Sequence, residues 1–134
     1  MTLRHGERGA VSTFLAVIAL ALLMAAGLAV DGGRKISALR EASHLAESAA
    51  RAGAQAVDPD VFRTTGIIHL DPDQAIEAAG DYLAAVGHIG QITIEGDTVT
   101  VTVTLTVNPV LLPIGEMTVS ATETATAVTE EPGL

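Results

Sequence analysis

The histidines, serines and aspartates are the side chains of this sequence that could support catalysis or bind a metal, but their spacing matches no such site. No two histidines have the spacing of a helical or loop metal site. No serine lies in a GxSxG nucleophile elbow, and residues 31–34, DGGR, lack the spacing of a Walker A phosphate loop. We therefore expect no enzyme activity, no catalytic residue, no cofactor and no metal. The histidines are His5, His44, His69 and His88.

Four aspartates that lie close together in the sequence are the remaining candidates for ion binding: Asp58, Asp60, Asp71 and Asp73. Carboxylates at this spacing can hold Ca²⁺ weakly, but no twelve-residue calcium-binding loop is present. Helix capping and solubility explain these side chains better. The sequence has no Cys, which excludes disulfides and thiolate chemistry.

An uncharged apolar run, residues 9–30, organises the rest of the sequence. At about 1.5 Å of rise per residue, a helix of this length covers the roughly 30 Å hydrocarbon core of a bilayer. We predict a single transmembrane helix, a signal anchor in the cell membrane. The basic tag before it, residues 1–8, favours a cytoplasmic N-terminus, which leaves the rest of the chain extracytoplasmic.

A cleaved secretory signal is the alternative interpretation of this run. A basic start and the small residues at 25–29 are both typical of signal peptides. Two observations favour the anchor. The run is longer than the usual apolar region of about 7–15 residues, and the helical pattern continues beyond it.

The charge of the chain excludes nucleic acid as a partner. The net charge is −9, and residues 41–134 hold fourteen acids against Arg51 and Arg63. A surface with so few bases cannot neutralise the phosphates of a nucleic acid, and an anionic lipid surface would repel it. Contact with membrane lipid is therefore expected only through the apolar helix at residues 9–30, and not through the acidic part of the chain.

Residues 31–57 are predicted to continue the helix outside the membrane as a stalk, with Gly32-Gly33 as a soft joint. A stripe of small residues follows Leu39 at helical spacing, and small residues let helices approach closely. The stripe is either a helix-packing seam between the subunits of a filament or bundle, or the face of an Ala-rich stalk that packs on its own domain. Its members are Ala42, Ala46, Ala49, Gly53 and Ala56.

Residues 58–128 are predicted to form a small head. Residues 71–87 form its best-defined helix, with Asp71 as N-cap, Pro72 in the first position, Gln74 closing a capping box and Gly87 as the C-terminal stop. The expected buried stripe of this helix is Ile76, Ala79, Gly80, Leu83 and Val86. Residues 58–70 are expected to be a loop with a short strand, anchored by Phe62, Ile67 and Ile68.

Residues 88–107 are predicted to form a hairpin that turns at residues 95–97. Val and Thr alternate through 98–107, and a third strand spans 117–128. The fold class is therefore α+β, with one helix on a mainly antiparallel three-stranded sheet and an acidic tail at 129–134. The Thr rows indicate a solvated sheet face, or else a face that binds a surface or another strand. The apolar residues 110–114 form either an exposed partner-binding tip or a cover over the sheet edge.

The segment from Arg8 to Val57 resembles the N-terminal region of the TadE/TadG-like pilus-assembly proteins, the pseudopilin-like membrane components of the tight-adherence (Flp) pilus. The likeness lies in Arg8-Gly9, in DGGR at residues 31–34 and in ARAGAQA at residues 50–56. It implies a pilin-like lollipop, in which a hydrophobic helix holds an exported head. It also implies other pilins and the pilus-assembly machinery as partners.

The same resemblance implies a candidate processing site. In members cut by a prepilin peptidase, cleavage follows a Gly, with Glu at the fifth mature position and often Phe at the sixth. A cut after Gly9 would make Ala10 the first residue, Thr13 the fifth and Phe14 the sixth. Phe14 fits the pattern, whereas Thr13 replaces the Glu that would pair with a neighbouring N-terminal amine inside the lipid.

These observations predict a non-enzymatic, single-pass membrane protein that is a minor pilin or assembly factor of a tight-adherence pilus or a related secretion apparatus. Its partners would be other pilins or secretion proteins, with a homo-oligomer among the possibilities. The main alternative is a membrane-tethered envelope module for binding or cell adhesion. A small hydrolase is less favoured, because no arrangement of residues requires one.

Overall fold

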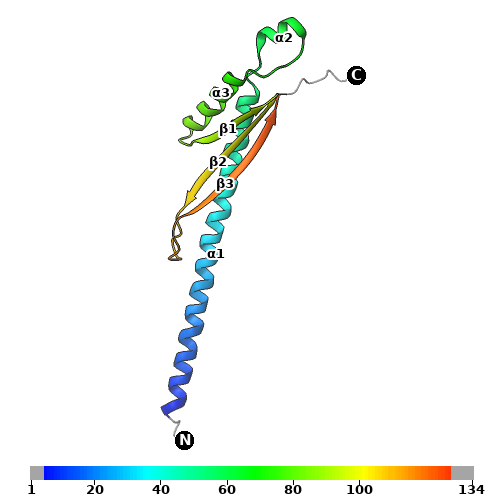
Figure 1. Ribbon diagram of the computed structural model, residues 1–134. Coiled ribbons are helices and arrows are strands. Elements are labelled where there is room, and N and C mark those ends of the chain that lie inside the picture. Colours follow the sequence, from blue (N-terminus) through cyan, green and yellow to red (C-terminus); the bar gives the residue numbers. More distant parts are fainter. Residues whose placement is uncertain (1–4, 128–134) are drawn as a thin grey trace, which may run out of the picture.

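The computed structural model describes residues 5–127, and their side chains from residue 9 onward. It confirms the predicted fold class, a long apolar N-terminal helix followed by a small α+β head (Figure 1). The domain boundaries drawn from the sequence stay predictions, and the acidic tail at 129–134 lies outside the described residues. The elements are α1 (His5–Ala54), α2 (Pro59–Thr65), α3 (Pro72–Ala85), β1 (Gly90–Glu95), β2 (Thr98–Val107) and β3 (Met117–Thr126).

Helix α1 runs without interruption for 50 residues. Gly32 and Gly33 are helical and neither has a positive φ, so the soft joint expected there is not seen. The helix is fixed on both sides of this pair. Asp31 is hydrogen-bonded to the chain after β2, and the small residues from Ala42 onward are packed against the head.

The sheet has the order β1-β2-β3 and is antiparallel throughout. Its register pairs Ile94 with Val99, and Val103 with Ala121. The strict alternation of β2 places its valines inward, where Val99, Val101 and Val103 are fully buried. This arrangement confirms the hairpin and the third strand expected from the sequence.

The core lies between the inner face of the sheet, the second half of α1 and helix α3 (Figure 1). Its largest aliphatic members are Leu83 and the β2 valines. Alanines supply the α1 side, because short side chains allow a helix backbone to approach a sheet and a second helix at once. A Cβ on Gly53 would lie 2.9 Å from the carbonyl oxygen of Ala75, so no other residue fits this approach without a shift.

Helix α3 begins and ends at the residues expected from the sequence. The Asp71 carboxylate accepts from the backbone N–H groups of Asp73 and Gln74. The capping box does not form as expected, because the Asp71 N–H donates to Ala56 and the Gln74 amide donates to the Asp71 carboxylate instead. At the other end, Gly87 has a φ of +78°, confirming its role as the stop.

The buried stripe predicted for α3 is right at Ala79 and Leu83, which are buried, and Gly80 is half-buried; it is wrong at Ile76 and Val86, and it omits Ala75. Its buried residues are Ala75, Ala79 and Leu83, whereas Ile76 is 45% exposed and Val86 is 44% exposed. The close packing of α3 on α1 explains the difference. An alanine fits the narrow space opposite Gly53, and the larger Ile76 side chain does not.

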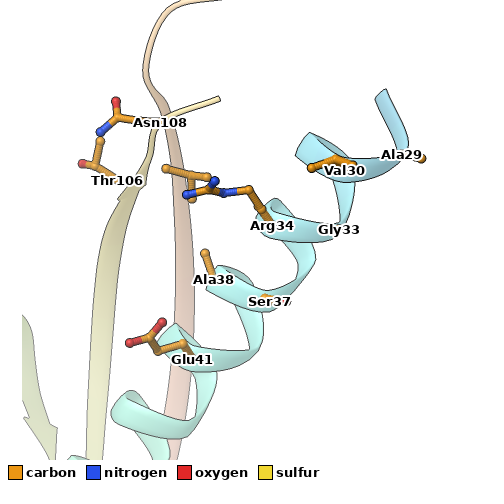
Figure 2. Close-up of a pocket in the computed structure, with 10 residues that line it drawn as sticks. Ala29, Val30, Gly33, Arg34, Ser37, Ala38, Glu41, Thr106 and Asn108 are labelled. Carbon is orange, nitrogen blue, oxygen red and sulfur yellow. The ribbon is translucent and has the colours of Figure 1, made fainter. Parts of the chain in front are cut away.

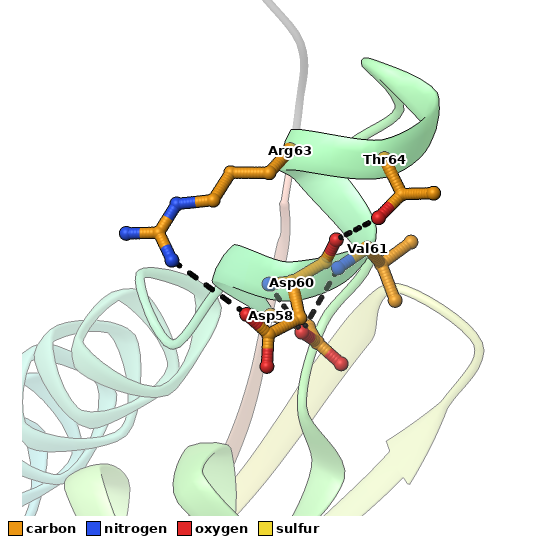
Figure 3. Close-up of polar contacts among 5 residues, drawn as sticks. All are labelled: Asp58, Asp60, Val61, Arg63 and Thr64. Atoms are coloured by element: carbon orange, nitrogen blue, oxygen red, sulfur yellow. Dashed lines mark hydrogen bonds and ion pairs between the residues drawn. The ribbon is translucent and has the colours of Figure 1, made fainter.

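Residues 58–70 were predicted to be a loop with a short strand, and this prediction is wrong for the first half. Asp58 ends the preceding segment and also caps helix α2, because its carboxylate accepts from the N–H groups of Asp60 and Val61 (Figure 3). The strand is reduced to one bridge between Val57 and Leu70. Of the three residues expected to be buried anchors here, Phe62 and Ile67 are exposed and Ile68 is half-buried; Leu70 is buried instead.

Candidate functional site

Asp31 lies at the end of the apolar run and is the buried charged residue of the described chain, with only 2% of its surface exposed. Its carboxylate accepts three backbone hydrogen bonds from the connection between β2 and β3. The N–H of Val110 donates to Oδ1 at 2.9 Å, and those of Leu111 and Leu112 donate to Oδ2 at 3.1 and 2.8 Å. One side chain of α1 thus fixes a loop that lies 79 to 81 residues later in the chain.

These contacts keep Asp31 ionised. The hydrogen bond from the Val110 N–H, followed by those from Leu112 and Leu111 and by the charge of Arg34, holds the pKa of Asp31 below its ordinary value. Burial opposes this effect, because it disfavours the charged form, but the hydrogen bonds outweigh it. No role for Asp31 was predicted; the available signal was an acid at the end of an apolar run, one turn before an arginine.

Apolar contacts join the same loop to α1. A Cβ on Gly27 would lie 3.4 Å from Leu112 Cδ2 and 3.5 Å from Leu111 Cβ, which is ordinary van der Waals contact. An apolar hollow continues along the helix from this point. It is lined by Leu20, Leu23, Met24 and Leu28 of α1 and by Leu111, Leu112 and Pro113 of the loop. Residues 110–114 were expected to be either an exposed partner-binding tip or a cover over the sheet edge. The loop instead packs on α1, and Val110 and Leu111 stay exposed.

A second, more polar hollow opens between α1 and the end of β2. Arg34 extends from the helix toward Thr106 and Asn108, and Glu41 borders the hollow two turns further on (Figure 2). On the helix, this hollow is lined from Ala29 to Glu41, so polar side chains begin to line α1 at the level of Arg34.

The N-terminal half of α1 contacts little of the molecule. Helix residues from Gly9 onward contain a stretch long and apolar enough to cross a membrane, and almost none of it is buried. Its large side chains face outward all around the helix, with Phe14 64% exposed and Leu23 70% exposed.

Residues 9–56 match the family model described as putative Flp pilus-assembly TadE/G-like. No curated protein and no solved structure matches the chain.

The match confirms the resemblance found in the sequence, over residues 9–56, which we call the TadE/G-like segment. This segment comprises the exposed apolar half of α1 and the half that packs on the head. Asp31 and Gly27 lie inside it, whereas the loop that they contact lies outside it. Residues 57–134, which hold α2, α3 and the whole sheet, are beyond the match.

The stripe of small residues in the TadE/G-like segment is covered by the chain's own head. Ala42, Ala46 and Ala49 are fully buried, and Gly53 is buried between α3 and β2. Ala56 is half-buried just beyond the helix, and Leu39 is exposed. This geometry is that of a stalk packed on its own domain, the second of the two interpretations.

A polar contact missed in the sequence lies beside this stripe. The hydroxyl of Ser43 on α1 donates to the Glu123 carboxylate of β3, 2.5 Å away. Glu123 occupies the inward-facing register of β3, between Ala121 and Ala125. An acid at an inward position of an alternating strand was the available signal, because such a group needs a partner when it is desolvated.

The candidate processing residues lie at the exposed start of α1. Gly9 and Ala10 are exposed and helical, and the Thr13 hydroxyl donates to the Gly9 carbonyl at 2.9 Å. Cleavage after Gly9 stays a prediction.

The residues described from 5 to 127 hold no group of three or more His, Asp or Glu side chains arranged to bind a metal. His69 Nδ1 lies 3.4 Å from Asp97 Oδ1, which also accepts a hydrogen bond from the Leu70 N–H.

The outer face of the sheet is a row of hydroxyls. Three cross-strand pairs join β2 and β3 by hydrogen bonds of 2.8 to 3.2 Å: Thr98 with Thr126, Thr102 with Thr122, and Thr104 with Ser120. The hydroxyls bond to one another along this face, and no described element covers it. This agrees with the interpretation of the Thr rows as a solvated face.

Proposed function

We propose that this protein is a non-enzymatic, single-pass membrane component of a tight-adherence pilus or a related secretion apparatus, where it acts as a minor pilin or assembly factor. The observation that carries the proposal is the match of residues 9–56 to a pilus-assembly family. The matched segment coincides with an exposed apolar half-helix and its continuation under the head. A helix that is apolar all round suits lipid or other helices rather than water.

The proposed mechanism is physical. The N-terminus lies in the cytoplasm, α1 crosses the bilayer and the head projects outward. Because the head covers the stripe at Ala42–Gly53, we assign contacts with other subunits to the apolar half of α1. The Thr face of the sheet is a second surface for contacts between heads, including heads of further copies of this chain.

Cysteine labelling tests the proposed orientation, since the natural chain has no Cys. Thr104 lies on the exposed face of β2, and Thr2 lies in the basic tag. A membrane-impermeant maleimide applied to intact cells should label Thr104→Cys at once and Thr2→Cys only after the membrane is permeabilised. The opposite pattern would place the head in the cytoplasm and contradict the proposal.

Affinity purification after crosslinking in native membranes tests the proposed partners. The full chain should retrieve pilus or secretion components. The matched control replaces residues 9–30 with an unrelated transmembrane helix of equal length, and it should lose them. If the control retrieves the same proteins, the head binds them and the anchor is only a tether. If the natural chain retrieves no such component, the pilus assignment is wrong.

The intact mass of the protein extracted from its membranes tests the predicted processing site. Loss of residues 1–9 would support cleavage between Gly9 and Ala10 and the role of a filament subunit. The full-length mass would support a permanently anchored assembly factor. Loss of about thirty residues, the length of a secretory signal, would contradict the membrane anchor.

A further inference from the structure

The connection between β2 and β3 reaches back toward the N-terminal half of α1 (Figure 1). Its residues 109–113, PVLLP, which we call the 109–113 loop, contact the helix at Gly27 and border the hollow lined by Leu20 and Leu28. These helix residues belong to the run that we propose to span the membrane. The loop and the membrane span therefore lie at the same level of the molecule.

The rise of the helix gives the depth of this contact. Gly27 is three residues and Leu20 is ten residues before Val30, the last residue of the apolar run. At 1.5 Å per residue these positions lie about 5 Å and about 15 Å below Val30 along the helix axis. If the run fills the hydrocarbon core, the side chains of the 109–113 loop lie in its outer leaflet.

The backbone N–H groups of the loop are suited to an apolar medium. Non-helical backbone rarely enters lipid, because each unpaired N–H or C=O group costs several kcal/mol there. Pro109 and Pro113 have no N–H, and the N–H groups of Val110, Leu111 and Leu112 all donate to Asp31. The loop thus has no free backbone donor over five consecutive residues, a condition that an aqueous loop does not require.

The side chains of the loop agree with this environment. Val110 is 62% exposed and Leu111 is 55% exposed, and Ile114 beyond them is also exposed. Residues 98–115 contain no charged group. Arg34, one turn above Asp31, extends into the polar hollow at the end of β2, at the level where lipid phosphates would lie (Figure 2). Basic side chains at that level favour anionic headgroups.

We propose that the 109–113 loop is a second membrane-inserted element, which enters the outer leaflet beside α1 and contacts lipid acyl chains through Val110 and Leu111. Asp31 makes the insertion possible, because it satisfies the three backbone donors that the loop carries into the bilayer. The inserted loop holds the head at a fixed depth and a fixed rotation about α1. The proposal rests on the membrane span of the proposed function.

Lipid-depth quenching on the full chain in liposomes tests the insertion. Single cysteines carry an environment-sensitive fluorophore at Leu111→Cys, with Thr104→Cys as the aqueous control and Val17→Cys as the membrane control. We expect lipids brominated on their acyl chains to quench the labels at 111 and 17, and iodide in the buffer to quench the label at 104. A low protein-to-lipid ratio keeps copies apart.

The controls separate the possible failures. If iodide quenches the label at 111 as strongly as the label at 104, while the label at 17 stays lipid-quenched, the insertion is wrong and the membrane span stands. If the label at 17 also escapes lipid quenching, the span itself fails. If the label at 111 is shielded from lipid and iodide alike, and more so at high protein-to-lipid ratio, a neighbouring copy covers the loop and the lipid contact is refuted.

A second variant tests the role of Asp31 without altering the loop. In Asp31→Ala, which removes both carboxylate oxygens and with them all three hydrogen bonds to the loop, lipid quenching of the label at 111 should fall severalfold and iodide quenching should rise. The label at 17 should not change. Unchanged lipid quenching at 111 in this variant would show that the loop inserts without Asp31 and would overturn that part of the proposal.

Discussion

Substitution of Gly53 by Ala measures how closely α1 approaches the rest of the head. The added Cβ would lie 2.9 Å from the Ala75 carbonyl oxygen, 3.1 Å from Val99 Cγ1 and 3.4 Å from Ala79 Cβ. The nearest of these atoms belongs to the backbone of α3, so it cannot rotate away and α3 must shift. Overpacking of this kind costs about 1–3 kcal/mol in the free energy of unfolding.

A matched control on the same helix removes the effect of helix propensity. Replacing Gly by Ala in a helix interior stabilises it by about 1 kcal/mol. A Cβ on Gly33 would meet nothing within 4 Å, so Gly33→Ala should show this gain alone. The difference in the free energy of unfolding between the two variants is then the cost of overpacking alone, about 1–3 kcal/mol. The melting temperature of Gly53→Ala should then lie about 4 °C or more below that of Gly33→Ala.

The assay is thermal unfolding of the full chain in detergent, followed by far-ultraviolet circular dichroism and by the fluorescence of Tyr82. Tyr82 is the one tyrosine of the chain and packs against the core, so its signal reports on the head. Equal gains in melting temperature for the two glycine variants would refute the reasoning, because they would mean that α3 does not press on Gly53.

Three further predictions concern the core, a helix cap and the loop contact. Leu83→Ala should lower the free energy of unfolding by about 2–5 kcal/mol in chemical denaturation, and Ile76→Ala should cost far less, since Leu83 is buried and Ile76 is not. Asp71→Ala should cost about 1 kcal/mol by loss of the N-cap, with Asp73→Ala as a control that caps nothing in α3. The pKa of Asp31 is lowered from 3.8 in the folded state, so its contribution is present above pH 3.8 and is lost as the pH falls through the lower folded value. Thermal melts from pH 2 to pH 6 should therefore show a smaller acid-side loss in Asp31→Asn than in the natural chain; identical profiles would contradict this.

Much of the fold follows from local patterns in the sequence. Alternation of Val and Thr through 98–107 assigns both the strand and its two faces. Asp71-Pro72 and Gly87 mark the ends of α3, because capping depends on neighbouring residues alone. The same signal at Asp58-Pro59 was interpreted only as the end of a helix, although it also begins α2.

The features missed in the sequence depend on contacts between distant residues. Periodicity shows that one side of α3 is apolar, but the close approach at Gly53 decides that Ala75 rather than Ile76 faces inward. The hydrogen bonds of Asp31 join residues 79 to 81 positions apart, and no local pattern encodes them. The same holds for the pair of Ser43 and Glu123. The long apolar helix was predictable from the sequence, whereas the loop that lies along it was not.

The long separation between Asp31 and its partners also sets an order of events during biosynthesis. Val110 is made 79 residues after Asp31, and at roughly 5–20 residues per second this takes about 4–16 s. Throughout that interval the carboxylate stands at the edge of the apolar run without its three donors. In the proposed membrane topology, its hydrogen bonds can form only when β2 has been completed and has emerged on the same side of the membrane as Asp31. If the proposed topology holds, packing of the loop on Asp31 is therefore a late step that follows translocation of the head.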